Sequence, residues 1–448
     1  MKLKLKPKMS VWQYLSLGYL IVILLGSVLL VLPISSTSGG VNYLDALFTS
    51  TSAACVTGLV PFDTAISWTT FGQIVILVLI QLGGLGFTTF VSIIFLMVKH
   101  QLGLNERKAM IQSVGGNKLA GVKTLILRIL VGTFSIEFVG AALLCIRFIP
   151  DFGAGKGIYY AIFHSISAFC NAGFDLMGSV WGNGSSLSHY ATDPLVVLVI
   201  SVLIIVGGLG FCLWGDVLDC KFNPKKFQFY TKVILVVNTV LLVLPTLLFL
   251  LFERNNVTYA GYNFGQHLLC AFFNATTART AGFFTTDPAS LSQSGYLLTV
   301  ILMFIGGSSG STAGGLKVGT FTVIVVGMFA VLRGKRDITI GKRRIEDSLL
   351  GQALAIFTAY LVLVLLATAA ICAVQPQFTF AEVLYEAVSA LGTVGLSTLN
   401  AERGIVCKII LILLMYLGRV GVLTFAFALR RKHDSTEVRK PVESFFIG

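Results

Sequence analysis

Residues 163–174 read FHSISAFCNAGF, a short and half-polar stretch within a strongly apolar chain. The stretch begins with an aromatic residue, continues through a Ser-Ile-Ser seam, and ends in a glycine followed by a second aromatic residue. Long apolar runs precede and follow it. A polar interruption of this kind needs a structural explanation, and the rest of the sequence offers one because the stretch recurs.

Three other segments repeat its pattern. Residues 48–59 read FTSTSAACVTGL, residues 272–283 read FFNATTARTAGF, and residues 385–396 read YEAVSALGTVGL. Each copy starts with an aromatic residue and carries, ten residues later, a glycine followed by an apolar residue. The glycines are Gly58, Gly173, Gly282 and Gly395. Four copies in register argue against ordinary turn glycines, which is the simplest alternative.

The composition identifies a membrane protein. Of the 448 residues, 55% are hydrophobic and only 12% are charged, with a mean hydropathy of +0.86. A soluble domain carries roughly 25% charged residues. We find eight apolar runs long enough to cross a hydrocarbon core of about 30 Å. They are residues 11–32, 71–98, 124–148, 195–218, 233–252, 296–332, 349–374 and 405–429.

Each motif copy lies between two of these runs, which predicts four units of helix, short segment and helix. A short segment such as 41–54 would be about 21 Å long as a helix, which suits a re-entrant segment. Re-entrant segments would leave the units parallel around an axis along the membrane normal. We therefore predict an all-α polytopic membrane protein with four parallel helix–pore-loop–helix repeats around a pseudo-fourfold central pore. The repeats are 11–98, 120–219, 231–332 and 349–429, flanked by an N-terminal segment 1–10 and a tail 430–448.

Charge indicates orientation. The formal net charge is +13, and most of the 33 Lys and Arg residues fall into a few segments, whereas 33–70 has none. The basic segments are 1–10, 99–123, 221–232, 333–344 and 430–440. By the positive-inside rule, both termini and the three connecting loops are cytoplasmic. The basic charge thus reports membrane topology rather than nucleic-acid binding. The eight cysteines form no C-x-x-C pair and read as buried apolar residues.

The motif glycines suggest a chemistry for the loops. Non-helical backbone at membrane depth is tolerated where it is buried in protein or lines water. Glycine adopts positive φ at little cost, so successive carbonyls can face one side. Four such loops can replace the water shell of a cation, and scarce carboxylates favour a monovalent one. We call these segments the motif loops and expect one well-formed ion site near the glycines, with weaker sites above. The motif loops comprise Val56, Thr57 and Gly58; Asn171, Ala172 and Gly173; Thr280, Ala281 and Gly282; and Thr393, Val394 and Gly395.

The sixth apolar run is interrupted by a glycine-rich loop. It consists of Gly306, Gly307, Ser308, Ser309, Gly310, Ser311, Thr312, Ala313, Gly314 and Gly315. No G-K-[ST] follows, so a phosphate-binding loop is disfavoured. The run predicts an irregular loop halfway through the membrane, and a kinked, tightly packed helix is the alternative.

Several polar side chains lie in or beside the apolar runs. Arg419 is a functional candidate by its depth; it faces the pore or pairs with an acid or with backbone carbonyls. Arg279 would brace the motif loops or a nearby acid, and Lys317 lies near the pore or reaches toward the cytoplasm. Glu137 is interpreted as structural, paired with Arg128 or Arg147. Six residues on the short segments are predicted to hydrogen-bond the motif loops from behind: His164, Ser165, Ser167, Asn274, Thr276 and Glu386.

The quartet CVTGL, CNAGF, RTAGF and GTVGL resembles the filters of the Trk/Ktr/HKT superfamily of potassium transporters. Further segments are similar to the bacterial Ktr branch, and the match extends over the whole chain. They are QLGGLGF at 81–87, VGGLGF at 206–211, FIGGSSGSTAGGLKVGT at 304–320 and YLGRVG at 416–421.

This resemblance implies a potassium-conducting subunit in the bacterial plasma (inner) membrane, forming a homodimer in which each protomer has its own pore. It also implies gating by the glycine-rich loop with Arg419, and control by a cytosolic ring of RCK-type subunits. The chain has no Rossmann fingerprint, so we expect no cofactor here and a nucleotide on the partner. Gly58 implies a preference for potassium, since serine stands there in some sodium-passing members.

Two other classes of function were weighed against this one. A secondary active transporter of another cation or a small solute would favour inverted repeats and a midplane site rich in substrate-specific side chains. An intramembrane enzyme would need a nucleophile–base pair or a motif such as H-E-x-x-H, whereas the five histidines are scattered. The sequence favours a channel-like, non-enzymatic uptake subunit for potassium.

Overall fold

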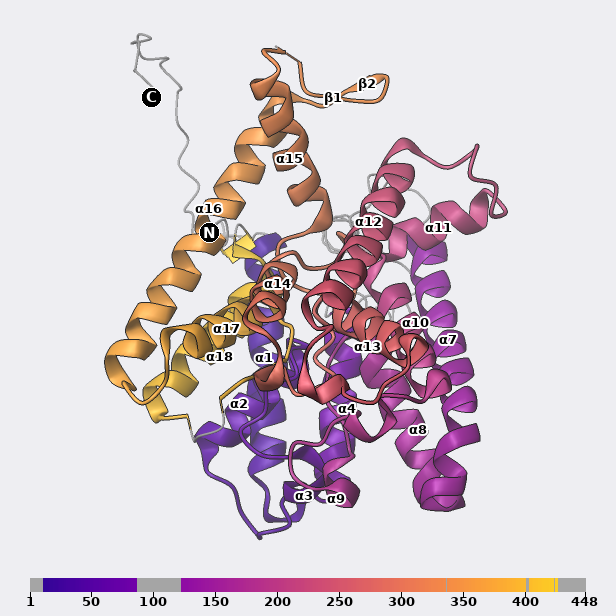
Figure 1. Cartoon of the computed structure of the whole chain (residues 1–448). Coiled ribbons are helices and arrows are strands. Elements are labelled where there is room, and N and C mark those ends of the chain that lie inside the picture. Colours follow the sequence, from indigo (N-terminus) through magenta and orange to yellow (C-terminus); the bar gives the residue numbers. More distant parts are fainter. Residues whose placement is uncertain (1–10, 87–121, 336, 400–402, 423, 426–448) are drawn as a thin grey trace, which may run out of the picture.

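The computed structural model of the chain describes residues 11–86, 122–335, 337–399, 403–422 and 424–425. The predicted termini 1–10 and 430–448 lie outside this part, as do the end of the first predicted repeat and that of the fourth. The described chain is mostly helical and has almost no strands (Figure 1). A short antiparallel hairpin pairs β1 (Thr339–Ile340) with β2 (Arg343–Arg344). The predicted all-α membrane fold class is confirmed.

Four short helices end at the motif loops, and their buried faces include most of their C-terminal halves. They are α2 (Tyr43–Ala54), α8 (Ala154–Phe169), α13 (Phe264–Thr277) and α17 (Phe380–Gly392). Local sequence sets where they begin. Capping boxes, formed by Asn263 with Gln266 and by Thr379 with Glu382, start α13 and α17. Each pair satisfies backbone donors that a helix start leaves free.

Two apolar helices flank each short helix; we call them the long helices because each overlaps one of the long apolar runs of the sequence. They are α1 (Val11–Val31) and α4 (Thr70–Leu85), α7 (Val122–Phe152) and α10 (Pro194–Gly208), α12 (Phe229–Phe252) and α14 (Gln293–Phe304), and α16 (Asp347–Val374) and α18 (Ile405–Val420). Each short helix packs against both of its own flanking helices. It also packs against the second long helix of another unit: α8 on α4, α13 on α10, α17 on α14, and α2 on α18. The contacts therefore run through the units in chain order and return to the first.

Further helical elements connect these helices. They are η1 (Pro33–Ser35), α3 (Thr64–Ser67), α9 (Gly178–Trp181), η2 (Ser188–Tyr190), α11 (Phe211–Asp219), η3 (Val257–Tyr259), η4 (Pro288–Ser290) and α15 (Val318–Leu332). In Figure 1, α3 and α9 lie together at one end of the molecule, and the β1–β2 hairpin lies beyond α15 and α16 at the opposite end.

Span lengths depart from the sequence-based expectation. Within the described residues, three helical segments are long and apolar enough to cross a membrane alone: Ile126–Phe152, Phe229–Phe252 and Ser348–Val374. The run at 195–218 is not one straight helix, because α10 and α11 meet at an angle of 92°. Gly210 adopts φ +96°, and the Phe211 amide donates to the Gly310 carbonyl of the glycine-rich loop instead of continuing the helix. The predicted break in 296–332 is confirmed, since residues 305–317 separate α14 from α15.

Candidate functional site

The four motif glycines, which are far apart in the sequence, meet at one place; we call them the ring glycines. A Cβ added to Gly173 would lie 2.7 Å from the nearest backbone oxygen of the third motif loop. Added to Gly282, it would lie 2.5 Å from one of the fourth. The oxygens that face Gly58, Gly173, Gly282 and Gly395, in this order, are those of Ala172, Ala281, Val394 and Thr57. Each ring glycine thus abuts the next motif loop, and the circle closes from the fourth back to the first.

The backbone of the motif loops follows one alternating pattern. The ring glycines have φ values of 95°, 69°, 84° and 97° in chain order. Positive φ also occurs two residues before each glycine, at Val56 (56°), Asn171 (60°), Thr280 (69°) and Thr393 (51°), but not at the residue between. Three of these four residues are β-branched, for which positive φ is a genuine outlier. Strained backbone of this kind persists where the surroundings hold it, and such places are often functional.

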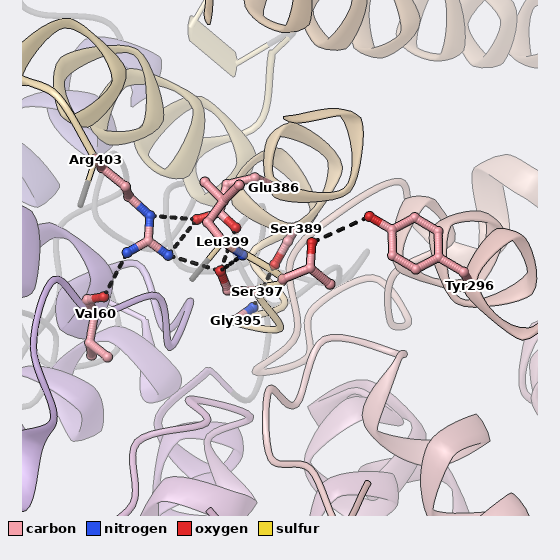
Figure 2. A network of polar contacts seen from close by, with 9 residues as sticks. Val60, Tyr296, Glu386, Ser389, Gly395, Ser397, Leu399 and Arg403 are labelled. Atoms are coloured by element: carbon pink, nitrogen blue, oxygen red, sulfur yellow. Dashed lines mark hydrogen bonds and ion pairs between the residues drawn. The ribbon is translucent and has the colours of Figure 1, made fainter. Parts of the chain in front are cut away.

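Hydroxyl groups of the short helices hold the first and fourth motif loops. Ser52 on α2 accepts a hydrogen bond from the Gly58 amide at 3.0 Å. Ser389 on α17 accepts one from the Gly395 amide at 3.1 Å (Figure 2). These two serines occupy the same position of the motif, six residues before the glycine, and each fixes the amide of a ring glycine.

The second and third motif loops are held just beyond their glycines. Ser167 donates to the Phe174 carbonyl at 2.7 Å, as predicted for a residue behind the loop. In the third copy Thr277 donates to the Phe283 carbonyl, whereas Thr276 bonds its own helix. The role predicted for Thr276 is therefore wrong by one residue. In this copy the Ala281 amide donates to the Thr277 carbonyl, four residues back, whereas the corresponding amide of the other copies donates five residues back, as Ala172 does to Ser167.

The other predicted supports bind elsewhere. Ser165 donates to the Glu137 carbonyl at 2.6 Å and so joins α8 to α7. His164 Nε2 lies 3.4 Å from the Leu176 amide, beyond the second motif loop. Asn274 donates to the Tyr259 hydroxyl at 3.0 Å. These residues position the short helices, and their expected bonds to the motif loops are not formed.

A polar cavity opens above the ring glycines, and all four of them line it. Its volume is about 940 Å³. Carboxylates line its wall, at Asp63, Asp175 and Asp287. Burial, and secondarily the charge of Asp63, raises the pKa of Asp175 to about 7. Arg403 and Lys408 also line the cavity, but each is paired with an acid, Glu386 and Asp45 respectively. The remaining acidic groups would attract cations to the ring.

A buried ion pair braces the fourth motif loop (Figure 2). Arg403 Nη2 lies 2.7 Å from Glu386 Oε1, and the two side chains are only 9% and 1% exposed. Ser397, two residues after Gly395, donates to Glu386 Oε2 at 2.7 Å and accepts from Arg403 at 2.9 Å. The predicted support Glu386 therefore acts through Ser397.

The same arginine also reaches the first unit. Arg403 Nη1 donates to the Val60 carbonyl at 3.0 Å, so Figure 2 shows its guanidinium between Val60 on one side and Glu386 and Ser397 on the other. Val60 stands two residues after Gly58, as Ser397 does after Gly395. The arginine thus ties together the outer ends of the fourth and first motif loops. The sequence does not predict this role of Arg403, because no pattern near residue 403 indicates a contact with residue 60.

The glycine-rich loop is bound to the bend between α10 and α11. The Ser308 amide donates to the Gly208 carbonyl at 3.0 Å, and the Thr312 amide donates to the Gly207 carbonyl at 3.3 Å. In return, the Gly310 carbonyl accepts from Phe211 at 2.9 Å. The loop is irregular, as predicted, and its backbone groups are satisfied by a second break in a helix.

Two cationic side chains bind successive carbonyls of the glycine-rich loop. Arg419 donates to the Thr312 carbonyl and to the Gly83 carbonyl of α4. Lys317 Nζ donates to the Ala313 carbonyl at 2.7 Å. Arg419 therefore takes the carbonyl-bound alternative, and Lys317 folds back onto the loop.

The glycine-rich loop also touches the motif loops. The side-chain amide of Asn171 lies 3.2 Å from Thr312 Oγ1. A Cβ on Gly314 would overlap the Thr393 hydroxyl. The loop thus lies directly against the second and fourth motif loops.

Arg279 makes a different contact from the one expected. Its guanidinium donates to Asn238 of α12, and Asn238 in turn donates to Ser308 Oγ at 3.2 Å. The arginine therefore connects the end of α13 to the glycine-rich loop and braces neither motif-loop carbonyls nor an acid. Asn238, an amide in the middle of an apolar helix, was the signal that sequence reasoning missed.

Candidate cation ligands are backbone oxygens. Within the described residues, no group of three or more His, Cys, Asp or Glu side chains is placed to hold a metal ion. The motif loops bring carbonyl groups together instead, with C-terminal helix ends behind them. This arrangement suits a weakly bound monovalent cation.

Fold and site together define a multi-pass membrane transport protein built around four converging loops. The TrkH family model, described as "Cation transport protein", matches residues 13–440. The chain belongs to this cation transport family. Membership confirms the prediction of a transport protein of the Trk/Ktr type rather than an enzyme.

Individual relatives cover the chain almost completely. It is 39% identical to the "Potassium/sodium uptake protein NtpJ" of Enterococcus hirae, over 100% of this chain and 99% of the relative. It is 38% identical to the "Ktr system potassium uptake protein B" of Bacillus subtilis, over 97% and 96% of the two chains. The crystal structure of the potassium transporter TrkH from Vibrio parahaemolyticus superimposes with a TM-score of 0.72 at 19% identity, covering 96% of this chain and 86% of that one. The last comparison supports the fold alone.

Proposed function

We propose that this chain is the potassium-conducting membrane subunit of a Ktr-type uptake system, and that potassium passes through the ring glycines. The observation that carries the proposal is the closed circle of motif loops at the floor of the outer cavity. Its backbone alternates in handedness, which can direct successive carbonyls toward one axis. Carbonyls arranged in this way replace the hydration shell of a cation without binding it irreversibly.

Potassium is the proposed ion because relatives of near-complete coverage carry it in their names. One of those names also includes sodium, so the degree of selectivity is the property to measure. The ring agrees with potassium preference in having glycine at all four positions, Gly58 included. Flux is proposed to be downhill and driven by the membrane potential.

The glycine-rich loop is the proposed gate. Its contacts with Asn171 and Thr393 place it against the motif loops, and Arg419 and Lys317 hold three of its consecutive carbonyls. A fixed guanidinium charge close to the path raises the barrier for a cation. Opening would require the loop to release Gly207 and Gly208 as well.

The remaining parts of the proposal concern assembly and orientation. The relatives named as parts of a "Ktr system" support a membrane subunit that works with a separate regulatory component. We propose a homodimer in the bacterial plasma membrane with cytoplasmic termini, and a cytosolic RCK-type ring that carries the nucleotide. The basic loops support this orientation.

Uptake into proteoliposomes tests the function. Full-length protein, alone and with its cytosolic partner, is reconstituted and a negative-inside potential is imposed. Potassium should enter faster than sodium, without a requirement for any co-transported ion. Equal entry of the two ions would contradict the selectivity, and uptake that needs a second ion gradient would favour the secondary transporter considered above.

A further inference from the structure

A carboxylate lies unexplained in the middle of α7. Its neighbours along the helix, Phe134 and Phe138, are 55% and 75% exposed and face outward, whereas Glu137 is 4% exposed and turns inward. It belongs neither to the motif loops nor to the glycine-rich loop. An ionisable group at this depth is costly, and such groups commonly have a function.

The partners predicted for Glu137 from the sequence are engaged elsewhere. Arg128 pairs with Asp219 at 2.7 Å, and Arg147 pairs with Asp193 at 2.9 Å. The interpretation of Glu137 as an ion-pair partner of either arginine is therefore wrong. Among the residues that the structure describes, no Lys or Arg forms an ion pair with this carboxylate.

Its polar contacts are an amide and a thiol. Gln81 Nε2 of α4 lies 3.1 and 3.2 Å from the two oxygens of Glu137. Cys170 Sγ, at the end of α8, lies 3.9 Å from Oε1 and 3.7 Å from the Gln81 oxygen. One neutral amide and one weak thiol do not compensate a buried negative charge.

A bound proton resolves this imbalance. A protonated carboxyl is neutral and gains an O–H donor. Rotation of the Gln81 amide about its last torsion would present an acceptor oxygen to that donor, and both rotamers fill the same space. We propose that Glu137, Gln81 and Cys170 form an intramembrane proton-binding site behind the second motif loop.

The site touches the proposed conduction path through two neighbours. Cys170 directly precedes Asn171 of the second motif loop, and Ser165 of the same short helix donates to the Glu137 backbone. On the other side, a Cβ on Gly84 would lie 2.5 Å from Cys170 Sγ. The preceding residue of α4, Gly83, accepts a hydrogen bond from Arg419 through its carbonyl oxygen. Cys170 thus lies against the Glu137 carboxyl and against the residue of α4 that follows the Arg419 contact.

The position of Glu137 predicts the direction in which pH changes potassium uptake. This prediction rests on the proposed function. An ionised Glu137 offsets the charge of Arg419 and attracts a cation to the second motif loop, whereas the protonated form leaves Arg419 unbalanced. Potassium uptake should therefore rise with pH. The titratable group facing Glu137 is the Cys170 thiol. The neighbouring helices α4 and α10 carry no charged residue, and Asp219 of α11 is paired with Arg128. On α8, Lys156 is exposed, and the two ring nitrogens of His164 lie against the Tyr160 carbonyl and the Leu176 amide.

Infrared spectroscopy reads the proton without any transport. The experiment uses the full-length D175N protein in lipid at neutral pH, because Asp175, with a pKa of about 7, would contribute a band of its own. The carbonyl-stretch band of a protonated carboxylic acid should be present in D175N and should be lost when E137Q is added. The matched control is E253Q, because Glu253 is equally buried but accepts hydrogen bonds from Ser292 and Asn256. That variant should keep the band.

Three results would overturn the assignment: absence of the band in D175N, its retention when E137Q is added to D175N, or its disappearance when sodium is added at constant pH. The coupling to transport has its own test, also made in D175N because Asp175 lines the outer cavity and titrates in the same range. Potassium uptake by proteoliposomes should increase with pH in D175N with or without E253Q, and this dependence should vanish when E137Q is added. An unchanged pH profile after E137Q is added would refute the coupling, even if the band behaves as expected. Because the infrared result does not depend on ion flux, failure of the proposed function would be recognised separately.

Discussion

At the scale of single residues, the ring glycines are the positions where the side chain matters by its absence. Gly58 combines a φ of 95° with a Cα that faces the Ala172 carbonyl. Any side chain there pays backbone strain and also displaces a candidate ligand of the next motif loop. Because the motif loops are in close contact, a substitution at one ring glycine changes its own loop and also the neighbouring loop.

Replacing Gly58 by serine should narrow the preference for potassium over sodium. The left-handed conformation costs a non-glycine residue about 1–2 kcal/mol. The new Cβ would also overlap the Ala172 carbonyl oxygen and displace this candidate ligand. A change of about 1–2 kcal/mol at the ion site corresponds to a loss of selectivity on the order of tenfold. The ratio of potassium to sodium uptake in proteoliposomes measures it.

Gly261→Ser is the matched control for this variant. Gly261 has a φ of 90°, but a Cβ there meets no atom within 4 Å. It carries the same backbone strain away from the ring glycines and should leave the uptake ratio unchanged. An unaltered ratio in Gly58→Ser would remove Gly58 from the conduction path.

Arg403→Gln should destabilise the protein, because it leaves Glu386 buried without its cation. Loss of one partner of a buried ion pair costs about 3–5 kcal/mol. Thermal unfolding of the purified protein should show a clear decrease in the midpoint temperature. The control Arg344→Gln breaks an exposed pair with Asp337, at 57% and 54% exposure, which contributes about 0–1 kcal/mol. Equal shifts in the two variants would contradict the assigned role of Arg403.

At the scale of elements, two broken helices support one another. The bend between α10 and α11 and the glycine-rich loop between α14 and α15 exchange backbone hydrogen bonds. Neither break would be tolerable alone at membrane depth, because its backbone groups would lack partners. The glycine-rich loop is thus stabilised by a second irregularity from another unit.

These elements also show what the sequence could and could not reveal. The break at 306–315 was predictable because glycines and serines interrupt an apolar run. The bend at 209–210 was not predicted, although Gly207, Gly208 and Gly210 mark it, because three glycines without polar residues still leave a continuous apolar run at 195–218. Likewise, the motif located the ring glycines, but the offset of Thr277 became visible only from backbone hydrogen bonds. Glu137 and Arg403 each have one partner on another unit, Gln81 and Val60 respectively, and such pairings leave no local signal.

Removing residues 308–313 should accelerate potassium uptake if the glycine-rich loop is the gate. The deletion removes the amides that bind Gly207 and Gly208 and the carbonyl that binds Arg419. Initial rates in proteoliposomes measure the effect, after size-exclusion chromatography has shown that the variant is folded. Arg419→Gln, which keeps the loop intact, should also raise the rate by removing a fixed positive charge. Unchanged flux in both folded variants would favour the tightly packed alternative.

At the scale of the whole molecule, the helix contacts close on themselves. The short helix of each unit packs on a long helix of another, and α2 completes the circuit on α18. The motif loops follow the same order at the centre, so the packing of the periphery and the geometry of the ring are coupled. A structural change in one unit should therefore displace the helices of its two neighbouring units before those of the unit opposite.

The central claim is that the ring glycines surround a binding site for a monovalent cation. Anomalous diffraction from crystals grown in rubidium, a heavier substitute for potassium, tests it most directly. The account predicts a peak on the axis of the ring, close to the carbonyls that precede Gly58, Gly173, Gly282 and Gly395, and its loss when sodium replaces rubidium. A well-ordered ring with no peak, or a peak only at carboxylates such as Asp63 and Asp175, would contradict it.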